Sequence, residues 1–153
     1  LKGFIKEIIE EMQPIAQKTN NTLEFIQQRD IRVYADRIQL KRVIKNLIQN
    51  AISYGEPNFP IEVSIGEIPQ YIVIKVKDYG AGISKTDIDK IFNKYYSAAK
   101  KFRKIGTGLG LYLALQIIKS HNGELSVESE EGNFTEFTIK LPAVMNINLH
   151  YGE

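Results

Sequence analysis

The 153-residue sequence contains no cysteine, and only two of its residues are histidines. The lack of cysteine excludes disulfide bonds, thiolate metal sites and thiol nucleophiles. No segment approaches the roughly 18 consecutive apolar residues of a membrane-spanning helix, and no signal-peptide pattern is present. Neither sign of charge dominates, because the formal net charge is only +2. We therefore expect neither a nucleic-acid nor a membrane-surface partner.

What is present suits one globular domain, since 43% of the residues are hydrophobic and 25% are charged. The sequence begins at Leu1 rather than at a methionine, so we expect a fragment of a longer protein. We predict one domain over residues 1–142, in which residues 1–8 connect to a helix outside this chain. Residues 143–153 have no strong pattern and are predicted to form a tail.

Apolar residues spaced three to four apart predict helices, because that spacing places them on one helical face. Pro14 predicts a kink or a break in the first helix. Asp36 is a candidate N-cap of the second helix, and Ser84 with Asp87 resembles a capping box before the third. The predicted helices cover residues 1–28, 36–54, 84–95 and 109–120.

Alternating apolar and polar residues predict strands, and Gly66 with Pro69 predicts a turn between two of them. The predicted strands cover residues 31–35, 61–65, 71–77, 125–129 and 135–141. Antiparallel hairpins mixed with helices favour an α+β fold, a two-layer sandwich with helices packed on one face of a sheet.

Two asparagines lie one turn apart on the second predicted helix. Asn46 and Asn50 belong to a polar stripe that also contains Arg42 and Ser53, at i, i+4, i+8 and i+11 spacing. Their amide oxygens could bind a hard cation such as Mg²⁺. The alternative is a solvated helix face.

A second motif, Asp78-Tyr79-Gly80-Ala81-Gly82-Ile83, directly follows a predicted strand. An aspartate at a strand end can accept a hydrogen bond from an exocyclic amine such as that of adenine. Two glycines behind it allow the backbone to approach a ligand closely. A simple glycine-rich turn is the alternative.

A third motif, Gly106-Thr107-Gly108-Leu109-Gly110, leads into the last predicted helix, where backbone amides could bind phosphate. It matches neither the dinucleotide fingerprint nor the Walker A sequence. The preceding residues 90–104 are basic and contain no acid, so they could close over a polyphosphate. A solvated loop or a partner-docking patch is the alternative. The cations of this segment are Lys90, Lys94, Lys100, Lys101, Arg103 and Lys104.

The order and spacing of these segments resemble the histidine-kinase branch of the superfamily that also contains gyrase, heat-shock chaperone and mismatch-repair ATPases. Residues 36–51 match the N box of that family, and residues 78–83 match its first glycine box. Residues 91–96 resemble its F box, and residues 106–111 match its second glycine box. The resemblance covers roughly residues 4–142. It implies a Bergerat-type fold with a mixed, mostly antiparallel sheet.

The resemblance also implies a role for each matching residue. Asn46 and Asn50 would be the catalytic residues, with Asn50 as the Mg²⁺ ligand and Asn46 supporting it. Asp78 would bind the adenine amine, Tyr54 would pack near the adenine, and residues 97–105 would form a lid over ATP. The remaining implied nucleotide contacts are Gly80, Gly82, Ile83, Tyr96, Lys101, Gly106, Thr107, Gly108, Leu109, Gly110 and Leu111.

The implied activity is that of a protein-histidine kinase of a bacterial two-component system. ATP and Mg²⁺ would be the cofactors, and the acceptor histidine would lie on a dimerisation domain of the same parent protein. Neither His121 nor His150 is followed by the acidic residue and proline expected of an acceptor. We expect a monomeric, cytoplasmic catalytic domain, a parent that can be membrane-anchored, and a downstream response regulator.

Two positions depart from the family pattern, which commonly has cations where this chain has Ser53 and Ser97. The departures leave open a regulatory module that senses nucleotide without transferring phosphate. An anti-sigma-type serine kinase shares the fold, but that class usually has an acid in place of Asn46. Gyrase-like hydrolysis would also require a carboxylate there as a general base.

Overall fold

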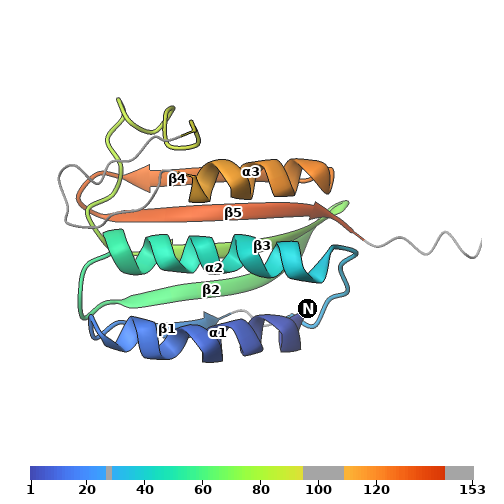
Figure 1. Cartoon of the computed structure of the whole chain (residues 1–153), viewed down its shortest axis with the longest axis horizontal. Helices are drawn as coiled ribbons and strands as arrows, with labels where there is room; N and C mark the ends of the chain where they lie inside the picture. Colours follow the sequence, from blue (N-terminus) through green and yellow to red (C-terminus); the bar gives the residue numbers. More distant parts are fainter. Residues whose placement is uncertain (27–28, 95–108, 144–153) are drawn as a thin grey trace, which may run out of the picture.

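The structure is a computed structural model that describes residues 1–26, 29–94 and 109–143. These residues form a five-stranded sheet and three α-helices (Figure 1). The helices are α1 (Lys2–Gln17), α2 (Arg37–Tyr54) and α3 (Gly110–Ser120). The strands are β1 (Thr22–Ile26), β2 (Pro60–Ile68), β3 (Tyr71–Asp78), β4 (Glu124–Glu130) and β5 (Phe134–Pro142).

The strands lie in the order β1-β2-β3-β5-β4. β1 runs parallel to β2, whereas the other three neighbouring pairs are antiparallel. Both predicted hairpins form, as β2 with β3 and as β4 with β5. The mixed, mostly antiparallel sheet predicted from the sequence is therefore confirmed.

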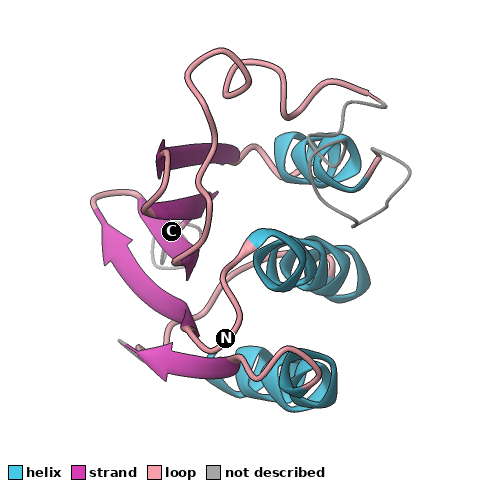
Figure 2. Cartoon of the chain, turned by 90° about the vertical axis from the view of Figure 1, so that its left-hand side faces the viewer, coloured by secondary structure: helices cyan, strands magenta, loops and turns pink. Residues whose placement is uncertain are grey.

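All three helices cover the same face of the sheet, with α2 between α1 and α3 (Figures 1 and 2). Side chains on this face alternate with those on the other face, as the period of a strand requires, and β5 buries every second residue. No helix in the described part of the chain is long and apolar enough to cross a membrane. Fully buried side chains between the two layers include Ile8, Ile44, Leu47, Ile48, Ile65, Ile74, Ile118 and Ile139.

The prediction of one helix over residues 1–28 is wrong, because α1 ends at Gln17 and β1 follows it. The chain turns at Asn20, whose φ of 58° lies in the left-handed region that asparagine tolerates. Next to it, the buried Asn21 amide donates hydrogen bonds to two carbonyl oxygens of the loop before β2. These acceptors belong to Glu56 and Phe59, at 2.9 and 2.8 Å.

Pro14 lies inside α1, so of the predicted kink or break the break does not occur. The first predicted strand is also wrong in extent, because residues 31–35 contribute only a single bridge, from Val33 to Ala143. One isolated bridge does not make a strand, since the ladder needs successive paired residues.

The third predicted helix is wrong within the described residues, because residues 84–94 lie mostly in turns. The expected cap is present, since the Ser84 hydroxyl accepts a hydrogen bond from the Asp87 N–H at 3.3 Å. Later hydrogen bonds span only three residues, as from Lys90 to Asp87. Phe92 instead packs edge-on against Phe137 of β5, with ring centroids 6.2 Å apart.

Asp36 is the N-cap of α2, as predicted, and its carboxylate accepts from the Gln39 N–H at 2.9 Å. An Asp36→Ala variant loses this acceptor and leaves a first-turn N–H without a partner. We expect the free energy of unfolding to fall by about 1 kcal/mol. Urea denaturation measures this loss, and Asp36→Asn, which keeps the acceptor, should retain most of the stability. Equal losses in both variants would contradict a capping role.

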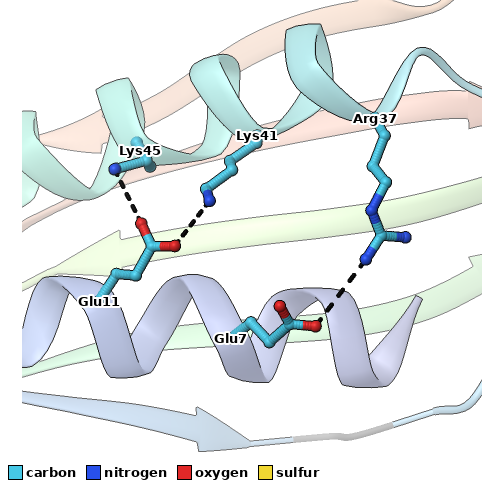
Figure 3. A network of polar contacts seen from close by, with 5 residues as sticks. All are labelled: Glu7, Glu11, Arg37, Lys41 and Lys45. Carbon is cyan, nitrogen blue, oxygen red and sulfur yellow. Dashed lines mark hydrogen bonds and ion pairs between the residues drawn. The ribbon is translucent and has the colours of Figure 1, made fainter.

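A charged seam joins α1 to α2 (Figure 3). Glu11 binds both Lys41 and Lys45, at 2.6 and 3.0 Å, and Glu7 lies 3.8 Å from Arg37. The two lysines lower the pKa of the Glu11 carboxyl. Because all these side chains are exposed to solvent, the seam contributes little to stability. It does orient the side chains of three α2 cations toward α1.

Candidate functional site

Asp78 is the last residue of β3, and its side chain lies on the helix-covered face with 5% of its surface exposed. Burial raises the pKa of this carboxyl from 3.8 to about 7, although a hydrogen bond from the Gly80 backbone N–H lowers it. A carboxyl held where ionisation is costly is a common feature of binding and catalytic sites.

Two glycines bring the end of α2 against the turn after β3. Gly55 and Gly80 form an isolated antiparallel bridge. A Cβ atom on Gly80 would lie 2.5 Å from the Tyr54 carbonyl oxygen, and one on Gly55 would lie 3.3 Å from the Asp78 Cβ. Only residues without a side chain allow this crossing. The backbone at the end of α2, from Tyr54 to Gly55, thereby lies against the turn that follows Asp78.

The rest of the turn after β3 is bonded to the hairpin formed by β4 and β5. Gly82 has a φ of 70°, and a Cβ there would lie 2.3 Å from a backbone oxygen at the end of β4. The Ala81 carbonyl accepts from the Gly132 N–H at 2.6 Å. The Ile83 N–H donates to the Ser129 hydroxyl at 2.8 Å. The motif therefore contacts the end of α2 on one side and the β4–β5 hairpin on the other.

Tyr79 lies within this motif but belongs to the opposite face of the sheet. Its hydroxyl donates to the Glu62 carboxylate at 2.9 Å. The Lys77 ammonium lies over the rings of Tyr79 and Phe134, 5.1 and 4.7 Å from their centroids. Burial and the Glu62 carboxylate raise the pKa of the Tyr79 hydroxyl. The Tyr79 side chain therefore lies on the face of the sheet that the helices do not cover, away from Asp78.

The polar stripe of α2 runs alongside the beginning of α3. The Asn46 side-chain N–H donates to the Gly110 carbonyl at 3.3 Å, which leaves the Asn46 amide oxygen as an acceptor. The half-buried Asn50 amide makes no hydrogen bond within the described part of the chain. α3 begins at Gly110 after Leu109, whose apolar side chain cannot cap the helix. Its first-turn N–H groups therefore suit an anion.

These contacts arrange the residues of the candidate site along α2, from its C-terminal end toward its N-terminal end. Asp78 and the glycine crossing lie at its C-terminal end, near Tyr54. Asn50 lies one turn before that end, and Asn46 lies one turn earlier, beside the N-terminus of α3. A buried carboxyl and an uncapped helix N-terminus thus lie beside opposite ends of the asparagine stripe of α2.

Several predicted contacts lie outside the described residues: Tyr96, Lys101, Gly106, Thr107 and Gly108. The same holds for the whole of the predicted lid, residues 97–105. At the edge of the described part, the Lys94 ammonium lies 5.7 Å from the centroid of the Tyr112 ring on α3. Of the described members, Asn46 contacts Gly110 at the start of α3, and Gly80 pairs with Gly55 directly after Tyr54. The assignment of these residues to a nucleotide stays a prediction.

Two residues of the site could not be identified from their own motifs. Gly55 directly follows the second predicted helix, yet it forms the bridge to Gly80. Ser129 was assigned only to a strand, yet its hydroxyl accepts from Ile83 and donates to the Phe134 carbonyl at 2.7 Å. Contacts across 25 and 46 residues leave no local signal in a sequence.

A family model described as histidine kinase-, DNA gyrase B-, and HSP90-like ATPase matches residues 35–145. The chain belongs to this family. Sensor histidine kinase WalK of Bacillus subtilis (strain 168) is 34% identical over 145 residues, which cover 91% of this chain and 23% of WalK. Sensor protein SrrB of Staphylococcus aureus (strain NCTC 8325 / PS 47) is 38% identical over 109 residues, which cover 70% of this chain and 19% of SrrB.

Solved structures agree with this assignment. The nucleotide-free catalytic domain of histidine kinase ThkA superimposes with a TM-score of 0.79 at 29% identity, covering 94% of this chain and 92% of that domain. Full-length ShkA in complex with AMPPNP has a TM-score of 0.80, covering 94% of this chain and 30% of ShkA, and at 21% identity it supports the fold alone.

Within the family, the chain corresponds to the catalytic ATP-binding domain of sensor histidine kinases. The resemblance stated from the four boxes is confirmed, and so is the predicted use of ATP by an ATPase-family domain. The chain spans less than a quarter of the length of the two sensor proteins.

Proposed function

We propose that this domain binds ATP with Mg²⁺ and donates the γ-phosphoryl group to a histidine on a separate dimerisation domain of the same parent protein. The observation that carries the proposal is the arrangement of the site along α2. Its buried carboxyl lies at one end, and the uncapped N-terminus of α3 lies at the other. This arrangement suits a nucleotide whose base is recognised by hydrogen bonding and whose phosphates are bound by backbone amides.

At the base end, Asp78 accepts a hydrogen bond from the adenine amine, and Tyr54 packs near the ring. Gly80, Gly82 and Ile83 shape the pocket, because side chains at the two glycines would collide with neighbouring backbone. At the phosphate end, the amides from Leu109 to Leu111 bind the phosphates. Tyr96, Lys101, Gly106, Thr107 and Gly108 complete the proposed contacts.

Mg²⁺ fits the residues at the phosphate end. No cluster of three or more His, Cys, Asp or Glu side chains that could hold a metal occurs among the described residues. A magnesium ion that uses one protein oxygen, waters and substrate phosphates needs no such cluster. Asn50 would be its ligand, supported by Asn46, whose amide is oriented by Gly110. The bound ion would neutralise charge on the phosphates during transfer.

The chain's own residues position the reactants, and the acceptor lies elsewhere. His121 is an unsuitable acceptor because both of its ring nitrogens are engaged. Its Nε2 accepts from the Asp36 N–H at 3.0 Å, and its Nδ1 donates to the Ile117 carbonyl at 2.8 Å. These contacts tie the end of α3 to the start of α2, which is a structural role. His150 lies outside the described residues.

Calorimetry with ATP, in the presence and absence of Mg²⁺, tests the proposal. We expect the wild-type chain to bind ATP and Mg²⁺ to strengthen that binding. In Asn50→Ala, which removes the proposed ligand, the gain in affinity from Mg²⁺ should shrink about tenfold or more, since removing a side chain that ligates or supports a metal has an effect of this size. The control Asn58→Ala changes an exposed loop amide and should leave the gain unchanged. A folded wild-type chain that binds no ATP would refute the proposal.

The transfer step requires a second experiment, in which the parent's dimerisation helices are added. We expect acid-labile phosphohistidine to form on those helices and then to transfer to a response regulator. ATP binding without phosphohistidine would instead favour a nucleotide-sensing regulatory module, the second candidate. Ser53 favours that candidate, because a neutral hydroxyl that accepts from the Gln49 amide stands on the stripe of α2. We propose cytoplasmic catalysis within a parent that carries its own sensor region.

A further inference from the structure

We propose that Arg42 binds the γ-phosphate of the nucleotide and makes the site prefer ATP over ADP. This inference rests on the proposed ATP-binding function and adds a specificity-determining residue to it. The observation behind it is a difference between Arg42 and the other cations of α2.

Three of the four cations on α2 form ion pairs with residues of α1. Arg37 contacts Glu7 and lies over the Phe4 ring, 5.1 Å from its centroid, and both lysines bind Glu11 (Figure 3). Arg42 is exposed, and the described residues offer it no ion pair. It lies one turn before Asn46, so it belongs to the stripe that borders the site rather than to the seam with α1.

The direction of the site places Arg42 at the phosphate end. From Tyr54 to Asn46 the helix advances about 12 Å, and from Asn46 to Arg42 it advances about 6 Å more, at 1.5 Å per residue. The base is held beside Tyr54, and the first phosphates lie beside Asn46 and α3. The terminal phosphate, which ADP lacks, is then the group nearest to Arg42. A long guanidinium side chain can span one helical turn.

Arg42 is the one cation on the described polar stripe of α2. The other members of the stripe, Asn46, Asn50 and Ser53, are neutral. Lys94 lies over the Tyr112 ring of α3 rather than on the α2 stripe. A guanidinium presents several N–H donors to phosphate oxygens at once, which makes it the preferred partner of a terminal phosphate.

Calorimetry on the whole chain with Mg²⁺, comparing ADP with the non-hydrolysable β,γ-imido analogue of ATP, tests the proposal. In Arg42→Gln we expect affinity for the ATP analogue to fall about fivefold to tenfold, which is the size of one partly solvated charge-assisted hydrogen bond. ADP affinity should stay within about twofold. Arg42→Lys should restore part of the loss, since it keeps the charge.

Arg37→Gln is the matched control, because it removes the same charge from the same helix on the α1 side. It should change neither affinity, whereas a loss equal to that of Arg42→Gln would mean that only net charge matters and would overturn the proposal. Unchanged affinities in Arg42→Gln, or equal losses for both nucleotides, would also overturn it. If the wild-type chain binds neither nucleotide, the proposed function itself fails, which is a distinct result.

Discussion

Asp78→Asn should abolish ATP binding and, at neutral to alkaline pH, should stabilise the folded domain. Binding is lost because an amide in place of the carboxylate presents an N–H group toward the adenine amine or loses the stronger, charged acceptor. Sites built to recognise one hydrogen-bonding group lose at least about 100-fold in affinity when the match is removed. Retained ATP affinity in a folded variant would refute the adenine assignment.

The stability effect follows from the pKa of Asp78, which burial raises from 3.8 to about 7. Between these values the folded chain keeps a proton that the unfolded chain releases, so the wild-type free energy of unfolding falls as pH rises from about 4 to 7. Above pH 7 the full penalty is present. Asparagine has no charge to bury and can still accept from the Gly80 N–H, so the variant escapes this penalty.

Urea denaturation at several pH values measures the effect. At pH 8 we expect the variant to be more stable than the wild type by roughly 2–4 kcal/mol, since about three pKa units separate the two states. At pH 4 the two proteins should differ little. A difference that does not change with pH would show that the ionisation of Asp78 is not the cause. The comparison also shows whether binding at this residue is maintained at the expense of stability.

Gly82→Ala should be far more damaging than Gly132→Ala, although both residues have positive φ angles, 70° and 82°. Alanine in this conformation costs about 1–2 kcal/mol at either position. At Gly132 nothing lies within 4 Å of the added Cβ, so no other cost arises. At Gly82 the Cβ would lie 2.3 Å from the Glu130 carbonyl oxygen, and backbone must move.

The required movement separates the turn after Asp78 from the β4–β5 hairpin and strains the Ile83–Ser129 hydrogen bond. We therefore expect Gly82→Ala to lower the free energy of unfolding by about 3 kcal/mol or more and to weaken ATP binding strongly. Gly132→Ala should lose about 1–2 kcal/mol and keep its ATP affinity. Urea denaturation and calorimetry on both variants provide the comparison. Similar losses at the two positions would mean that the close contact at Gly82 relaxes easily.

The helices and hairpins that the sequence predicts well have strong local causes. α2 begins directly after Asp36, whose side chain caps it, and its apolar positions repeat at helical spacing over 18 residues. The β2–β3 hairpin follows from alternation on either side of a short turn, Pro69-Gln70, in which Gln70 has a φ of 72°. In both cases the deciding interactions lie within a few residues of one another.

The predictions that failed depended on distant partners. Residues 22–26 have no strong preference by themselves, and they become β1 because they pair with β2, nearly 40 residues away. Residues 84–94 satisfy a capping box but remain in turns, because Ile91 and Phe92 are drawn onto the core formed with Phe137. Tertiary packing outweighs a local preference of a few tenths of a kcal/mol, as such preferences are about that size.

By itself the sequence determined the family, the order of the motifs and most residues of the candidate site, because the spacing of asparagines and glycines along the chain reflects local chemistry. Only the tertiary structure decided how those motifs meet. It brought Gly55 against Gly80, joined Ile83 to Ser129 by a hydrogen bond, and paired Arg37 with α1 while giving Arg42 no ion pair among the described residues. Burial of Asp78 likewise arises from the layers around β3, because a carboxyl's cost of ionisation depends on everything packed around it.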